Sequence, residues 1–329
     1  MKKILFTGGG GAGSEALFRL LGERYETHFA DADRQAIDPS ISEERRHEIP
    51  FANDPAFADR LCEFFHSTSG REAGEQRQQR SEAKWQTLEI DLLVPGVDEE
   101  LPLVAGLVEE SRVSALLPPK AFVETHLDKA SSMRFLEPLG IAPQTVPAEE
   151  AAEIGFPCIV KPRSGRGSRG VAVIKSPEQL AAYLTFHEAA PGTVIAQELG
   201  LGQEFTVMMA ADSVGMLRAV VPVEVGIKRG ITLRAETVRD ETVEAACRKI
   251  HEANPVPGCY NIQLIHQDDD RILVFEINPR VSTTMCLGVA AGIDPIAIFL
   301  QNVEGNDLLP FTENLQLRRN WVNKIGSIL

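Results

Sequence analysis

The stretch Asn261–Arg280, NIQLIHQDDDRILVFEINPR, places three aspartates between two runs of alternating apolar residues. Such alternation favours strands and aspartates favour turns, so the stretch predicts an antiparallel hairpin. With Asp269–Asp270 as a two-residue loop, Gln263 lies directly opposite Glu276, with Cβ atoms about 5 Å apart. Asn278 lies two residues beyond Glu276 and therefore on the same face. The hairpin is thus predicted to gather a glutamine, a glutamate and an asparagine in one small patch.

Oxygen ligands from Gln263, Glu276 and Asn278 suit Mg²⁺ or Mn²⁺. The solvated face of an antiparallel sheet can carry the same residue types. The strand residues around the trio are apolar on both faces, however, so the polar groups need a partner and a metal site is favoured. Pro279 is expected to end the ladder and present Arg280, whose guanidinium suits a transferring phosphoryl group. The three turn aspartates are predicted to be solvated turn residues.

A second motif precedes the hairpin in PCIVKPRSGRGSRGVAVI, residues 157–174, where Lys161 ends an apolar strand. The loop after it is rich in glycine, serine and arginine, so its backbone N–H groups are free to converge on an anion. Lys161 is expected to project toward phosphate oxygens as a point charge. The loop lacks the G-K-[ST] ending of a Walker loop, and an exposed basic hairpin is the alternative interpretation. The loop residues predicted to contact phosphate are Ser164, Gly165, Gly167, Ser168 and Gly170.

A third motif lies at the amino terminus, where a strand at Lys2–Thr7, glycines at Gly8–Gly13 and a helix at Ser14–Leu21 follow one another. The next strand ends at Asp31, so the segment fits the G-x-G-x-x-G fingerprint of dinucleotide-binding domains. Glycines also permit a tight strand-to-helix turn in any βαβ domain. Because nothing later in the chain offers a hydride-transfer site, a structural or substrate-facing role is favoured over NAD binding.

Composition and charge restrict the class of protein. The chain has 329 residues, enough for two or three domains, and 43% of them are hydrophobic, as in soluble globular proteins. No apolar run approaches the roughly 20 residues that span a bilayer, and the first residues are typical of a strand rather than a signal peptide. Five scattered cysteines disfavour a disulfide framework or zinc site and favour the cytoplasm. A net charge of −14 argues against a nucleic-acid partner.

Taken in order, these motifs resemble the ATP-grasp superfamily, and within it the branch similar to the carbamoyl phosphate synthase large subunit. The resemblance covers nearly the whole chain and implies a fold of class α/β and α+β. It implies a Rossmann-like pre-ATP-grasp domain at 1–115, which does not bind NAD in this family. A two-lobed ATP-grasp fold would follow, with a small lobe and glycine-rich lid at 116–195 and a large lobe with the Mg/ATP site at 196–329. The polar residues 67–86 are predicted to be a solvated insertion or mobile segment.

The resemblance also implies roles for the nucleotide-binding residues. Lys129, at the start of a helix, is similar to the first ATP lysine of the family, and Lys161 with its glycine loop to the second lysine and the lid. The segment QELGLGQEFTV, residues 197–207, is similar to the hinge between the lobes. The hinge residues expected to contact the nucleotide are Gln197, Glu198 and Leu199 at the adenine and Glu204 at the ribose hydroxyls.

The predicted function is an ATP-dependent carboxylate–amine or carboxylate–ammonia ligase that works through an acyl phosphate. By resemblance, Gln263, Glu276 and Asn278 align with the magnesium ligands, while Arg280 and Lys161 align with catalytic residues. The substrate carboxylate would attack the γ-phosphate in line, and an amine would then capture the acyl phosphate. Closure of the glycine lid would exclude water. ATP and Mg²⁺, with Mn²⁺ as a substitute, are therefore the predicted cofactors.

The predicted substrates are a small-molecule acid and amine. Lys228, Arg229 and Arg234 in VEVGIKRGITLRAETV, together with Arg280, are candidates for holding the acid, and a solvated basic strand end is the alternative. A homodimer is expected from the family resemblance. The chain is far shorter than a carbamoyl phosphate synthase, with one grasp unit. A carbamoyl-phosphate-type ligase, a phosphotransferase, a non-catalytic nucleotide sensor and an NAD(P)-dependent oxidoreductase remain as alternatives.

Overall fold

The computed structural model describes residues 1–65, 88–301, 305 and 307–320. The predicted insertion at 67–86 lies outside these residues. The chain divides into two compact units, Met1–Glu124 with Pro279–Val281, and Thr125–Asn278 with Ser282–Leu329. This division falls inside helix α4 (Lys120–Leu127). The division into three parts that the sequence suggests stays a prediction.

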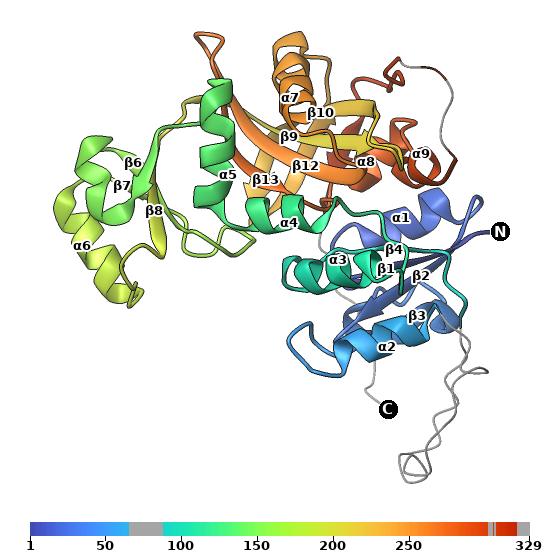
Figure 1. The fold of residues 1–329 in the computed structure, drawn as a ribbon. Coiled ribbons are helices and arrows are strands. Elements are labelled where there is room, and N and C mark those ends of the chain that lie inside the picture. Colours follow the sequence, from blue (N-terminus) through green and yellow to red (C-terminus); the bar gives the residue numbers. More distant parts are fainter. Residues whose placement is uncertain (66–87, 302–304, 306, 321–329) are drawn as a thin grey trace. The chain divides into compact units, whose positions relative to one another are not determined.

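The first unit contains a parallel sheet of four strands in the order β3-β2-β1-β4 (Figure 1). These strands are β1 (Lys3–Thr7), β2 (Glu26–Asp31), β3 (Arg46–Glu48) and β4 (Leu92–Val94). The helical segments between the strands are α1 (Ser14–Leu21), η1 (Arg34–Ala36), η2 (Glu43–Arg45) and α2 (Phe57–Glu63), and η3 (Asp98–Glu100) and α3 (Leu101–Glu109) follow β4. Strand β4 is buried throughout, as expected when both faces of a parallel sheet are covered.

The second unit begins with a small antiparallel sheet in the order β5-β8-β6-β7. Its strands are β5 (Thr145–Pro147), β6 (Cys158–Pro162), β7 (Ala172–Ile174) and β8 (Val194–Glu198), and the associated helical segments are α5 (Lys129–Leu136), η4 (Glu137–Leu139), η5 (Ala148–Glu153) and α6 (Pro177–Phe186). Cys158, Val160 and Ala196 pack with Tyr183 of α6 in its core. The sheet therefore fixes Lys161, which lies one residue beyond Val160, at the edge of a rigid core.

A second antiparallel sheet of six strands, in the order β13-β12-β9-β10-β11-β14, forms most of the rest of this unit (Figure 1). Its strands are β9 (Gly202–Ala211), β10 (Leu217–Arg229), β11 (Ile231–Thr237), β12 (Gly258–Gln267), β13 (Ile272–Asn278) and β14 (Gln316–Arg318), and the helices are α7 (Glu241–Ala253), α8 (Met285–Ala290) and α9 (Pro295–Gln301). The mixture of one parallel and two antiparallel sheets confirms the predicted fold class.

The hairpin of β12 and β13 has the predicted pairing but not the predicted loop. The loop has three residues, Asp268–Asp270, closed by a hydrogen bond of 2.9 Å from Gln267 N to Arg271 O. The expected two-residue loop is therefore wrong, because Asp270 takes a left-handed conformation with φ 63° and so lengthens the turn. Pairing then shifts by one residue at Phe275, which has no opposite residue in the ladder. This bulge returns Gln263 to its place opposite Glu276.

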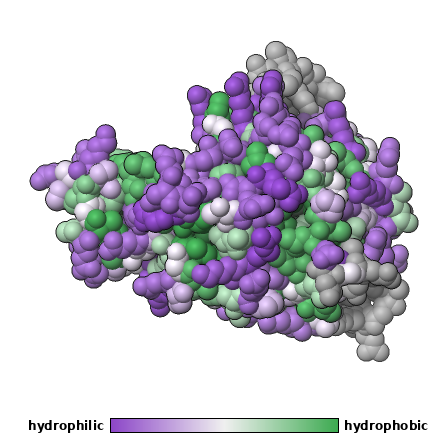
Figure 2. All heavy atoms as spheres, turned by 90° about the horizontal axis from the view of Figure 1, so that it is seen from above, coloured by the Kyte–Doolittle hydropathy of each residue, from purple (hydrophilic) through white to green (hydrophobic). Residues whose placement is uncertain are grey.

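The surface is mixed in polarity. Figure 2 shows hydrophilic side chains over much of one face, with hydrophobic patches between them. All five cysteines are buried with free thiols. Among the described residues, no helix is long and apolar enough to span a membrane.

Candidate nucleotide and metal site

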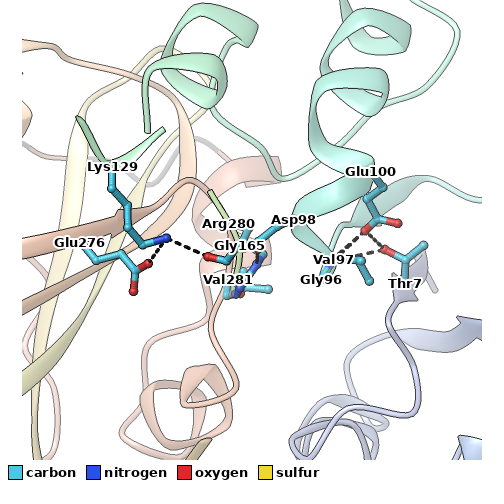
Figure 3. A network of polar contacts seen from close by, with 10 residues as sticks. All are labelled: Thr7, Gly96, Val97, Asp98, Glu100, Lys129, Gly165, Glu276, Arg280 and Val281. Carbon is cyan, nitrogen blue, oxygen red and sulfur yellow. Dashed lines mark hydrogen bonds and ion pairs between the residues drawn. The ribbon is translucent and has the colours of Figure 1, made fainter. Parts of the chain in front are cut away.

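Lys129 connects the glycine loop to the predicted metal patch. It follows Asp128, whose side chain caps helix α5 and forms an ion pair with Arg163. This ion pair holds the pKa of the Asp128 carboxyl below its usual value. The Lys129 ammonium donates a hydrogen bond of 2.7 Å to the Gly165 carbonyl and lies 3.1 Å from Glu276 Oε1 (Figure 3). Within the second unit, the first predicted ATP lysine thus contacts both the glycine loop and a predicted metal ligand.

Lys161, on β6, also contacts β13, the strand that carries Glu276. Its side chain is buried, with 4% exposed, and its ammonium donates a hydrogen bond of 3.0 Å to the Phe275 carbonyl. That carbonyl belongs to the bulge residue, so the irregularity in β13 supplies an acceptor to Lys161. The ammonium also lies 5.4 Å from the centre of the Phe275 ring. Burial lowers the pKa of Lys161 to about 8, while the Glu276 carboxylate acts in the opposite direction.

The predicted metal ligands lie on β12 and on β13, the outermost strand of the six-stranded sheet, and this part of the sheet is called the predicted metal edge. Gln263 is directly opposite Glu276, and Asn278 is directly opposite Asn261. Lys228 of β10 donates a hydrogen bond of 2.9 Å to Gln263 Oε1, and its ammonium is also hydrogen-bonded to Glu204.

The Lys129 ammonium therefore contacts Glu276 and the Lys228 ammonium contacts Gln263, so the patch accepts positively charged groups. Its donors are one carboxylate and two amides, the oxygen ligands that suit a hard cation, so these residues fit Mg²⁺. No three His, Cys, Asp or Glu side chains in the described part of the chain are grouped so that they could hold a metal.

Of the predicted hinge residues, one contacts a lysine at the predicted metal edge, and the others have different surroundings. Gln197 is buried on β8 and its amide donates a hydrogen bond of 2.9 Å to Thr145 Oγ1, so its side chain is engaged within the small sheet. Glu198 accepts from the backbone of Gln144 at 3.2 Å. Leu199 follows β8 and is half-buried. Glu204 alone of these residues contacts the lysine group, through Lys228.

The glycine loop is exposed from Ser164 to Arg169. Left-handed backbone angles at Gly165, Gly167 and Gly170 explain why glycine occurs there, and Ser168 takes the same conformation. Gly170 is anchored, because its carbonyl accepts from the Tyr183 hydroxyl. The loop is therefore fixed at its end by Tyr183 and near its start by Lys129, with exposed backbone between them.

The three basic residues predicted to hold the acid lie on the β10–β11 hairpin, and one of them, Lys228, contacts a predicted metal ligand. Lys228 pairs with Thr232 across the β10–β11 ladder, whereas the preceding residue, Ile227, pairs with Arg234. A register shift between Ile227 and Lys228 interrupts the regular alternation of faces between these two pairs. Arg229 is exposed beside the hairpin turn. The structure brings only Lys228 of the three to the predicted metal edge.

Arg280 contacts an acidic residue that the sequence did not single out. Its Nε donates a hydrogen bond to Asp98, and a terminal nitrogen donates to the Val281 carbonyl at 2.9 Å (Figure 3). Both residues belong to the first unit, since Pro279–Val281 is grouped with Met1–Glu124. The available signal was the acidic run Asp98–Glu100 soon after a buried strand, the place where parallel sheets carry functional side chains.

The third acid of that run, Glu100, is 2% exposed. Its Oε1 accepts hydrogen bonds from the Thr7 hydroxyl and from the backbone of Gly96 and Val97, the latter two at 3.0 and 3.1 Å (Figure 3). Burial raises the pKa of Glu100 to about 7, and the hydrogen bonds act against this shift. Glu100 was also missed, because nothing near it in sequence predicts its burial.

The amino-terminal glycine turn holds an acid from its own unit. Asp31 Oδ2 accepts from Gly10 N at 2.9 Å, and Oδ1 accepts from Asp33 N at 3.1 Å. A Cβ at Gly10 would lie 2.7 Å from that of Ala36, so the close approach requires glycine. The turn's glycine therefore has a structural explanation that involves no dinucleotide.

Comparisons with known proteins identify sequence relatives of this chain. Residues 191–325 match a family described as ATP-grasp in the biosynthetic pathway with Ter operon. The large chain of carbamoyl phosphate synthase from Thermotoga maritima is 28% identical over 240 residues, which is 65% of this chain and 21% of that protein. The arginine-specific large chain from Bacillus subtilis is 24% identical over 180 residues, 51% of this chain and 17% of that one. The chain thus spans about a fifth of the length of these relatives.

Solved structures show the same fold at low identity. N5-carboxyaminoimidazole ribonucleotide synthetase in its ADP complex has a TM-score of 0.65 at 14% identity, covering 95% of this chain and 79% of that one. Biotin carboxylase from Campylobacter jejuni, with β-γ-ATP, has a TM-score of 0.63 at 18% identity, covering 90% and 69%. The biotin carboxylase domain dimer of 2-oxoglutarate carboxylase from Hydrogenobacter thermophilus, with MgADP, ADP and bicarbonate, has a TM-score of 0.62 at 17% identity, covering 95% and 71%. These likenesses confirm the predicted ATP-grasp fold.

Proposed function

We propose that this chain, which has the ATP-grasp fold and is related in sequence to carbamoyl phosphate synthase large chains, is an ATP-dependent ligase that joins a carboxylate to an amine or ammonia. The observation that carries the proposal is the convergence of Lys129, Lys161 and Lys228 on the edge that holds Gln263 and Glu276. Three cations beside an oxygen-rich patch suit a polyphosphate and its metal.

In this proposal, each lysine has a distinct task. Lys129 and Lys161 bind phosphate oxygens, and the nearly complete burial of Lys161 strengthens its interaction with an anion. Gln263, Glu276 and Asn278 hold Mg²⁺, which supplies positive charge at the phosphate oxygens when it is bound. Glu204 gives up its contact with Lys228 when it binds the ribose. The loop from Ser164 to Gly170 covers the phosphates and excludes water.

The chemical step is transfer of the γ-phosphoryl group of ATP to the substrate carboxylate, which gives ADP and an acyl phosphate. Arg280 stabilises the charge on the transferring group. An amine or ammonia then attacks the acyl carbon, and inorganic phosphate leaves. Lys228 holds the acid, and its contact with Gln263, a predicted metal ligand, supports this role. The small-molecule partners, a homodimer and a cytoplasmic location stay predictions.

The alternatives differ in what they require. A carbamoyl-phosphate-type ligase or phosphotransferase uses the same site and differs in its product. A nucleotide sensor does not need Arg280. An oxidoreductase needs a free glycine turn, whereas Asp31 already accepts from Gly10. That contact favours a structural role for the turn.

The first experiment is calorimetry of ATP binding with and without Mg²⁺. We expect binding that depends on Mg²⁺ and is lost in the double variant Glu276→Ala, Asn278→Ala. A matched control, Asp268→Ala, changes the exposed loop of the same hairpin and should bind as wild type does. Tight binding of NAD(H) without binding of ATP would overturn the proposal. A wild-type protein that binds ATP is then screened for ADP release with acid–amine pairs, and with bicarbonate to detect the carbamoyl-phosphate-type reaction.

A further inference from the structure

The contact between Asp98 and Arg280 is nearly enclosed. The side chains of both residues are 14% exposed, and the Arg280 Nε donates to Asp98 Oδ1. One terminal nitrogen donates to the Val281 carbonyl at 2.9 Å. Among the described residues, the other terminal nitrogen has no hydrogen-bond acceptor. Two anchors thus fix the plane of the guanidinium and leave one of its edges for an incoming anion.

Asp98 is itself held by a rigid turn. It is the first residue of η3 and follows the turn at Gly96, whose amide donates to Glu100 Oε1 at 3.0 Å. The same oxygen accepts from the Thr7 hydroxyl at the end of β1. The buried Glu100 side chain therefore connects the turn that carries Asp98 to β1, an inner strand of the parallel sheet.

Close packing leaves this turn little freedom. A Cβ at Gly96 would lie 2.5 Å from the Thr7 carbonyl oxygen, a distance that only glycine avoids. Glu100 uses a single oxygen, Oε1, for its three hydrogen bonds. A glutamine at this position would keep that acceptor, whereas an alanine would leave the partly buried backbone donors of Gly96 and Val97 without this partner.

We propose that Asp98, held in place by the buried Glu100, positions the Arg280 guanidinium for phosphoryl transfer. The inference rests on the proposed function. Asp98 touches no substrate and acts through Arg280, so it is a positioning residue. Because Arg280 is expected to act on the transferring group rather than on bound ATP, Asp98 should affect the transition state and not nucleotide binding.

The test is a double-mutant cycle with a probe that needs no acid substrate. MgADP with aluminium fluoride mimics the transferring phosphoryl group, and its Kd is compared with that of MgATP. Asp98→Ala should raise the Kd of the mimic about tenfold to a hundredfold, as expected for loss of an aligned charge. It should change the Kd of MgATP by less than about twofold. Arg280→Ala should do the same. The double variant should bind the mimic no more weakly than Arg280→Ala alone does, because Asp98 then has no guanidinium to position.

Conservative variants separate positioning from folding. Asp98→Asn keeps an oxygen that accepts from the Arg280 Nε, so its affinity for the mimic should lie between those of wild type and Asp98→Ala. If the alanine variant does not fold, Asp98→Asn replaces it in the test. Glu100→Gln should bind the mimic more tightly than Glu100→Ala. The exposed Glu99, in the same turn, gives the matched control Glu99→Gln, which should match wild type.

Two results would overturn the inference. If the two fold-increases in the Kd of the mimic multiply in the double variant, Asp98 acts independently of Arg280. If Asp98→Asn weakens the binding of MgATP and of the mimic equally, Asp98 has a general structural role. Both results require a wild type that binds MgATP and the mimic. A wild type that binds neither would instead contradict the proposed function.

Discussion

The Lys228 ammonium lies 2.9 Å from the Gln263 side-chain oxygen, so the patch predicted to hold a metal already carries positive charge from the chain itself. A divalent cation that arrives without nucleotide must compete with this ammonium. We therefore expect Lys228→Gln to bind Mn²⁺ in the absence of nucleotide about tenfold more tightly than wild type, since one nearby like charge is removed. Titration followed by electron paramagnetic resonance measures the free Mn²⁺ directly.

The matched control is Lys175→Gln, which removes the same charge from an exposed position in the small sheet region. It should leave the Kd of Mn²⁺ within about twofold of wild type, because exposed charges are screened. Equal affinities for Mn²⁺ in wild type and Lys228→Gln would show that the ammonium does not compete for this patch.

Lys161 should matter more for nucleotide binding than for stability. Its ammonium is buried, and burial of a charge costs free energy that a single carbonyl acceptor does not fully offset. Methionine keeps an unbranched side chain that is one atom shorter, and it removes the charge. Lys161→Met should therefore unfold at the same or a higher temperature, while its affinity for MgATP falls about tenfold or more. Calorimetry and thermal unfolding measure the two effects. A lower unfolding temperature with unchanged MgATP affinity would assign Lys161 to the fold instead.

Glu100 should make the first unit less stable as the pH rises. Its pKa is raised to about 7 in the folded protein and lies near 4.5 in the unfolded chain, so folding favours the protonated form. Its contribution is fully present below pH 4.5 and is lost as the pH rises through 7. The loss is on the order of 3 kcal/mol.

The measurement compares wild type with Glu100→Gln, because histidines with lowered pKa values titrate in the same range and cancel in the difference. Urea denaturation between pH 4.5 and 8 should give the variant a growing advantage in free energy of unfolding. A constant difference across that range would mean that Glu100 does not titrate between these values.

Much of the fold followed from local patterns. Alternating apolar residues and glycine or proline punctuation identified the hairpin, the glycine loop and the βαβ start, since these signals act within a few residues. The hairpin also shows the limit of such patterns. Its three-residue loop and the bulge at Phe275 are two departures that cancel, so the pairing of Gln263 with Glu276 was correct although the loop was not.

The site was predicted where residues share a hairpin or follow a strand, and missed where contacts join distant segments. Asp98 and Arg280 are separated by 182 positions, and Thr7 and Glu100 by 93. No periodicity within either segment indicates such a pairing. The face to which Lys228 points likewise depends on the irregular β10–β11 ladder, which the sequence did not indicate.

The loop residue Asp270 provides a test of what fixes the hairpin register. Its φ of 63° is tolerated by aspartate and disfavours a β-branched residue. We expect Asp270→Val to lower the free energy of unfolding by about 1 kcal/mol or more, and Asp270→Gly to leave it equal or higher. Urea denaturation measures both, with Asp268→Val as the control, because Asp268 is not left-handed.

Nucleotide affinity should respond differently from stability. Strand β12 is paired with β9 along its whole length, and the bulge at Phe275 lies beyond the loop. The pairing of Gln263 with Glu276 therefore does not depend on the loop conformation. Folded Asp270→Val should bind MgATP within about twofold of wild type, since the metal patch is unchanged. A loss of affinity that parallels the loss of stability would mean that the loop, rather than the bulge and β9, sets the register of the site.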